Sequence, residues 1–124
     1  MAEVKAIQEM AYRVGVTSDN YVIYVNSVDV GNKPHFHYVE NISMGKEFHT
    51  CIRIDKAEYF FHEDKNDTLN NKQKNELQKF LSNPFKRPKF TGSNWEFSVM
   101  VWNDNNSKMV LDEENTKMPD YENL

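Results

Sequence analysis

The feature that most constrains the fold is a succession of short segments with β character before one segment with helical periodicity. Residues 21–25, YVIYV, are β-branched or aromatic throughout, which is typical of a strand buried on both faces. Residues 47–54 alternate between apolar and polar side chains, as expected of a strand with one buried face. The pattern also predicts a return strand over residues 57–62 and a last strand over residues 95–102.

Only one segment has the pattern of a well-formed helix. Asn70 is a favourable N-cap residue, and Gln73 follows it at the spacing of a capping box. Leu77 and Leu81 then lie on a narrow apolar stripe. Together these segments predict an α+β fold, with a mainly antiparallel sheet and one principal helix, about residues 70–82, packed on one face.

Length and charge predict one domain with an acidic end. A chain of 124 residues with 39% hydrophobic and 27% charged residues is typical of a single globular domain. The net charge of −4 comes from residues 104–124, which hold six acidic residues and two lysines. We therefore expect residues 1–103 to form the α+β domain and residues 104–124 to form a flexible acidic tail.

The only cysteine, Cys51, indicates a reducing compartment, because no disulfide can form within the chain. Residues 1–10 mix charged with short apolar side chains and lack the apolar centre of a signal peptide. The sequence has no apolar run of membrane-spanning length. We expect a cytoplasmic protein that has no contact with a membrane.

The four histidines all lie within 28 positions, at residues 35, 37, 49 and 62. His35 and His37 share one face of a predicted strand, because residues two apart in a strand point the same way. His49 shares a strand face with Cys51, so the right register would bring three imidazoles and one thiol together. Imidazole and thiolate are ligands of zinc, copper and nickel. The sequence predicts a site for zinc or another transition metal built on His35, His37 and His49.

Other roles for these histidines stay open. They could serve proton transfer or nucleophilic catalysis, with Cys51 beside His49, or they could only pack or contact a partner. The cupin pattern is not met, because no histidine follows His62, and Val39 occupies the position where histidine-triad hydrolases need a third histidine. The sequence also lacks a Gly-rich phosphate loop, Gly-x-Ser-x-Gly and Cys-x-x-Cys. These absences favour a protein that is not an enzyme.

The run YVIYVNSVDVGNKPHFHYVE, residues 21–40, resembles the start of a small bacterial family of unknown function with a Pro-His-Phe-His strand. Some members of that family occur beside toxin–antitoxin genes. The similarity continues through a hairpin at residues 52–55, the helix at residues 69–82 and Trp95, and it covers about residues 21–95. The resemblance implies a non-catalytic interaction or regulatory module of bacterial or phage origin that acts on a protein partner. It implies no catalytic residues.

A basic stretch interleaved with aromatic residues forms a second candidate surface. The run PFKRPKF places Lys86, Arg87 and Lys89 between Phe85 and Phe90. Such a pattern can bind phosphates while the rings stack on bases, and it can equally contact an acidic protein surface. We expect these five residues to bind a protein or a nucleic acid, with an ordinary solvated surface as the alternative.

Overall fold

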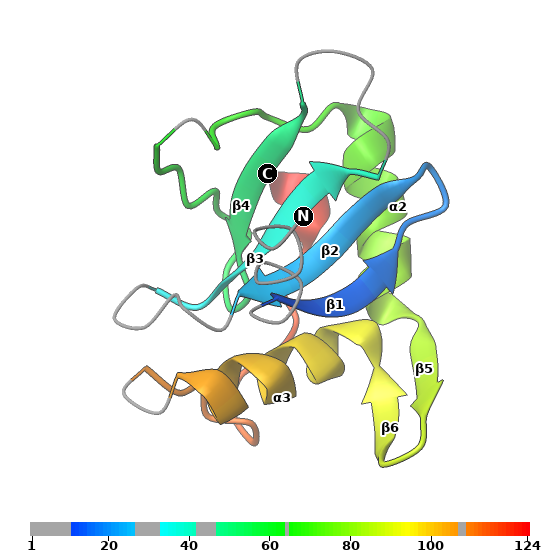
Figure 1. The fold of residues 1–124 in the computed structure, drawn as a ribbon, viewed down its shortest axis with the longest axis vertical. Coiled ribbons are helices and arrows are strands. Elements are labelled where there is room, and N and C mark those ends of the chain that lie inside the picture. Colours follow the sequence, from blue (N-terminus) through cyan, green and yellow to red (C-terminus); the bar gives the residue numbers. More distant parts are fainter. Residues whose placement is uncertain (1–10, 27–32, 42–46, 64, 107–108) are drawn as a thin grey trace, which may run out of the picture.

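The computed structural model describes residues 11–26, 33–41, 47–63, 65–106 and 109–124. Four strands form one antiparallel sheet in which each strand pairs with the next along the chain (Figure 1). They are β1 (Ala11–Val16), β2 (Tyr21–Asn26), β3 (His35–Glu40) and β4 (His49–Arg53). The predicted α+β fold with an antiparallel sheet is therefore confirmed.

The principal helix predicted over about residues 70–82 is also confirmed. It is α2, Asn71–Ser82, which packs on one face of the sheet (Figure 1). The capping box is complete, since the Asn70 side chain accepts from the Gln73 backbone N–H and the Gln73 side chain accepts from the Asn70 N–H. This reciprocal pair satisfies two backbone donors that a helix start would otherwise leave unpaired.

A second helix, α3 (Asn94–Asn105), replaces the strand predicted over residues 95–102, so that prediction was wrong. The apolar alternation of this segment also places Trp95, Val99 and Trp102 at helical spacing, and all three are buried. A capping box decides between the two structures: Ser93 accepts from the Glu96 N–H, and Glu96 accepts from the Ser93 N–H.

Between the two helices lies a hairpin of β5 (Pro84–Arg87) and β6 (Phe90–Ser93). Arg87 ties this hairpin to the rest of the molecule. Its Nη2 donates to the carbonyl oxygen of Val14 in β1 at 2.6 Å, and its guanidinium lies 3.8 Å from the ring centroid of Phe97 in α3. The ring of Phe90 packs against Phe97 as well.

The return strand predicted over residues 57–62 is not a regular strand. The segment after β4 pairs with β4 only through two isolated bridges, between Ile52 and Tyr59 and between Thr50 and Asn66. It still runs beside β4, because the Phe60 N–H donates to the carbonyl oxygen of Cys51 at 2.8 Å. We refer to residues 57–63 and 65–67 as the covering segment.

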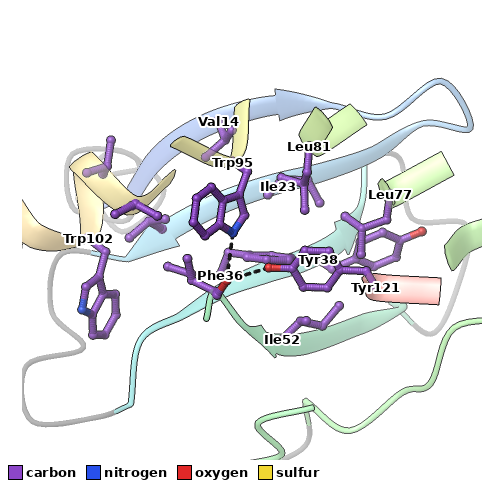
Figure 2. Close-up of a cluster of buried hydrophobic side chains, with 14 of the residues drawn as sticks. Val14, Ile23, Phe36, Tyr38, Ile52, Leu77, Leu81, Trp95, Trp102 and Tyr121 are labelled. Carbon is purple, nitrogen blue, oxygen red and sulfur yellow. Dashed lines mark hydrogen bonds between the residues drawn. The ribbon is translucent and has the colours of Figure 1, made fainter. Parts of the chain in front are cut away.

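The end of the chain packs into the core. Tyr121, in the short 3₁₀ helix η1 (Tyr121–Asn123), is fully buried, although the sequence predicted a flexible tail from residue 104. Its hydroxyl donates to the carbonyl oxygen of Ile54, as does the indole N–H of Trp95 (Figure 2). Burial of the large apolar ring of Tyr121 stabilises the folded state. Residues around Tyr121 therefore pack with the core of the domain.

Strand periodicity makes the two faces of the sheet chemically different. Phe36 and Tyr38 of β3 join the hydrophobic core beneath α2 (Figure 2). Their neighbours His35 and His37 therefore point to the opposite face. At these two residues that face is also closed to solvent, since 0% of His35 and 2% of His37 is exposed.

Candidate metal centre

Four histidines and one cysteine gather on the sheet face opposite α2. β3 contributes His35 and His37, and β4 contributes His49 and Cys51, with Cys51 directly opposite His37 in the register. His62 comes from the covering segment, with its ring centroid 5.6 Å from that of His35. The structure thus brings together side chains from three separate segments of the chain.

Three of these residues could hold a metal ion together. Ligand atoms of His35, His37 and Cys51 all lie within 4.8 Å of one another, and the three residues are buried. Around a tetrahedral zinc ion, two nitrogens are about 3.3 Å apart and a nitrogen and a sulfur about 3.6 Å apart. A pair at that upper limit would need to close by about 1.2–1.5 Å to bind zinc. The sequence predicted His35, His37 and His49 as the ligands. Among the described residues, the converging ligand atoms belong to His35, His37 and Cys51 instead.

A backbone carbonyl orients His35 for metal binding. Its Nδ1 lies 2.7 Å from the carbonyl oxygen of Lys33. Because a carbonyl can only accept, Nδ1 must donate, and the lone pair of the neutral ring is then on Nε2. Metal-binding histidines generally donate their other N–H to a carbonyl or carboxylate in this way.

The contacts of His37 favour coordination over nucleophilic catalysis. Its Nδ1 lies 3.0 Å from Nε2 of His49 and 3.3 Å from Sγ of Cys51. A catalytic thiol and the group that orients its base need opposite nitrogens of the imidazole, whereas Nδ1 is the nearer nitrogen in both contacts here, since Nε2 lies 4.0 Å from Sγ. Cys51 is also fully buried, which keeps a substrate away from the sulfur.

Aromatic side chains enclose the site. Tyr24 of β2 stacks on His37, with ring centroids 4.5 Å apart and planes 8° from parallel. Phe60 and Trp102 lie against His35, at centroid distances of 4.7 and 5.5 Å. An apolar shell of this kind excludes water and holds the imidazoles in place. The sequence alone does not predict this shell, because it depends on strand register and on the position of α3.

The residues predicted to bind a partner lie on the β5–β6 hairpin. Arg87 and Phe90 make the intramolecular contacts described above, and burial lowers the pKa of Arg87. Lys89 is exposed at the turn. The side chains of Phe85 and Lys86 lie outside the described part of the structure. Partner binding by this hairpin stays a prediction.

Comparisons with known proteins identify no relative. No protein-family model matches the chain, and neither the curated proteins nor the solved structures contain a significant match. The resemblance to the bacterial family with a Pro-His-Phe-His strand therefore stays a prediction. Within the residues that the structure describes, no helix combines the length and hydrophobicity of a transmembrane span.

Proposed function

We propose that this protein is a metal-binding module in which His35, His37 and Cys51 coordinate a transition-metal ion, with zinc as the first candidate. One observation carries the proposal: three buried ligand atoms from two paired strands lie within 4.8 Å of one another. Two imidazoles and a thiolate are ligands that zinc commonly takes, and copper accepts the same types.

The closed surroundings favour a structural or regulatory metal over a catalytic one. A catalytic zinc ion keeps one position open to water and substrate. Here the exposed fraction is 0% for His35, 2% for His37 and 0% for Cys51. A bound ion would cross-link β3 to β4 and stabilise the folded state by mass action. Such a module would act through a protein partner, the role that the family resemblance implies.

A cytoplasmic location is part of this proposal. Cys51 is buried and belongs to no disulfide, and only its thiolate can bind the metal. The cytoplasm keeps thiols reduced, whereas an oxidising compartment would favour their oxidation.

Metal analysis combined with thermal unfolding tests the proposal. Protein purified with a reducing agent is stripped with a chelator and reloaded with Zn²⁺, and we expect one zinc ion per chain. Free zinc at about 100 times Kd would stabilise the protein by about 2.7 kcal/mol and raise Tm by roughly 10 °C. His37→Ala and Cys51→Ala should lose the bound zinc and the rise in Tm.

Lys56→Ala is the matched control, because Lys56 is exposed just beyond β4, and it should bind zinc like the wild type. Circular dichroism of each zinc-free variant verifies that it is folded. A folded wild-type protein that retains no zinc, copper or nickel and keeps its Tm when they are added would overturn the proposal.

A further inference from the structure

We infer that a surface groove beside the candidate metal centre binds an acidic peptide segment of a partner protein, with an apolar side chain of that segment in the groove. The groove has a volume of about 510 Å³, and its lining comes from residues 33–34, from the end of β4 with the residues just after it, and from residues 109–111. We call it the basic groove. It lies next to the metal centre, because Arg53 faces His35 across the pairing of β3 with β4. The inference rests on the proposed function only for the existence of a protein partner.

The apolar wall of the basic groove has a firmly held backbone. The Trp102 indole N–H donates to the carbonyl oxygen of Met109 at 2.9 Å. The Asn103 side chain accepts from the Leu111 N–H at 2.7 Å and donates to the Leu111 carbonyl oxygen at 2.9 Å. Because these hydrogen bonds already order the wall, the protein loses little conformational entropy when a partner covers it.

The side chains on this wall are open to contact. The described part of the chain exposes four large hydrophobic side chains, and two of them, Met109 and Val110, are neighbours in this groove, exposed by 37% and 58%. Single exposed apolar residues are ordinary, whereas adjacent ones beside polar groups indicate an interaction site. The wall therefore suits an apolar side chain of a partner.

The rest of the groove is positively charged. Lys33, Arg53 and Lys56 line it, and Asp55 is the one acidic residue among its described lining residues. Asp55 accepts two hydrogen bonds from the Arg53 guanidinium, at 3.0 and 2.9 Å, and balances its charge. Lys33 and Lys56 are exposed and add two positive charges, although the whole chain has a net charge of −4. Positive charge beside an apolar wall attracts a segment whose apolar residue is flanked by carboxylates.

The lining favours a peptide over other anionic ligands. Surfaces that bind nucleic acids combine cations with aromatic rings that stack on bases, whereas the described residues of this groove include no aromatic ring. A lipid chain needs a pocket that buries most of its surface, whereas Val110 is open to solvent. A peptide can place one apolar side chain on the wall and its carboxylates beside the two lysines.

A peptide array tests the chemistry of the occupant. It carries short peptides with a central apolar residue flanked by glutamates, the same centres flanked by lysines, and serine centres flanked by glutamates. We expect the fluorescently labelled protein to bind only the first set. Binding should weaken as salt rises, because exposed charges are screened. Fluorescence anisotropy then measures the Kd of the best peptide for each variant.

Variants of the lining locate the binding site. The double variant Lys33→Glu and Lys56→Glu should weaken peptide binding roughly 10–100-fold, because like charges then face each other. Val110→Ser should weaken it about 10-fold through lost apolar contact. Lys72→Glu makes the same charge change on an exposed residue of α2, and Phe61→Ser removes an exposed apolar side chain outside the groove. Both controls should bind like the wild type, and circular dichroism verifies that each variant is folded.

Several results would overturn the inference. One is a wild-type protein that binds none of the acidic peptides, and another is equal affinity in the wild type and the groove variants. Tighter binding of single-stranded DNA than of any peptide, lost in the double variant, would assign the groove to nucleic acid. Self-association in analytical ultracentrifugation that the double variant abolishes would assign it to a second copy of the chain. Zinc binding without peptide binding would overturn this inference alone, whereas peptide binding without zinc binding would overturn only the proposed metal site.

Discussion

The phenol oxygen of Tyr121 lies 2.8 Å from the backbone carbonyl oxygen of Ile54, which also accepts the indole N–H of Trp95 (Figure 2). One buried acceptor thus joins the last turn of the chain, the start of α3 and the residue that follows β4. The two donors satisfy both lone pairs of this carbonyl. Tyr121, near the end of the chain, therefore contributes to the core both by its buried ring and by its hydrogen bond.

Replacing Tyr121 should lower the free energy of unfolding, and by more when the ring is removed than when only the hydroxyl is removed. Tyr121→Phe loses the hydroxyl but leaves Trp95 bonded to the Ile54 carbonyl, so we expect a loss of about 1 kcal/mol. Tyr121→Ala also empties part of the core and should cost about 3–5 kcal/mol. Urea unfolding measures both, with Tyr12→Phe as the control because Tyr12 is exposed. If Tyr121→Ala were as stable as the wild type, the end of the chain would not contribute to the core.

The buried tyrosines predict a loss of stability at alkaline pH. Burial raises the pKa of Tyr38 and of Tyr121, because each phenolate would lose its hydration. Tyrosines of the unfolded chain ionise near pH 10, so their contribution is complete below about pH 10 and falls as the pH rises further. The free energy of unfolding and the tyrosinate absorbance, followed together, should change in parallel. Tyr121→Phe should flatten the fall, and an identical slope in the variant would contradict this explanation.

Gly15 and Phe80 should show an energetic coupling. A methyl group at Gly15 would lie 2.7 Å from Cζ of Phe80, closer than carbon atoms approach. Gly15→Ala must displace that ring of α2, and we expect a cost of about 1–3 kcal/mol. Phe80→Leu removes the clashing atoms, so the double variant should lose less stability than the sum of the single variants. Simple additivity in denaturant unfolding would show that the strain has another source.

Arg87 should contribute to stability, whereas Lys89 should not. Arg87→Met removes the hydrogen bond to the Val14 carbonyl and the stacking on Phe97, and we expect a loss of about 1–3 kcal/mol. Lys89→Met, at the exposed turn of the same hairpin, should stay within about 0.5 kcal/mol of the wild type. Thermal and urea unfolding of the pair provide the comparison. Equal stability of the two variants would mean that Arg87 does not anchor the hairpin.

Patterns within a few neighbouring residues of the sequence predicted several of the strands and the principal helix. The β-branched run of β2, the alternation in β4 and the capping box of α2 each lie within a few residues, and all three elements form. The prediction that β2 is buried on both faces was wrong, because only Ile23 and Val25, on one face, are fully buried. The shared face of His35 and His37 also follows from the two-residue period of a strand. The alternation in residues 95–102 was ambiguous, because its apolar residues also fit a helix, and only the capping pair Ser93 and Glu96 distinguishes the two.

Only the tertiary structure decided which side chains meet. Cys51 faces His37 because of the register between β3 and β4, and a shift of one residue would send Cys51 to the opposite face. Neither strand encodes that register alone. The place of Tyr121 in the core likewise depends on a contact with Ile54, 67 positions earlier in the chain. The sequence by itself therefore determined the strands, the principal helix and the kinds of ligand available, whereas long-range packing decided which of those ligands converge.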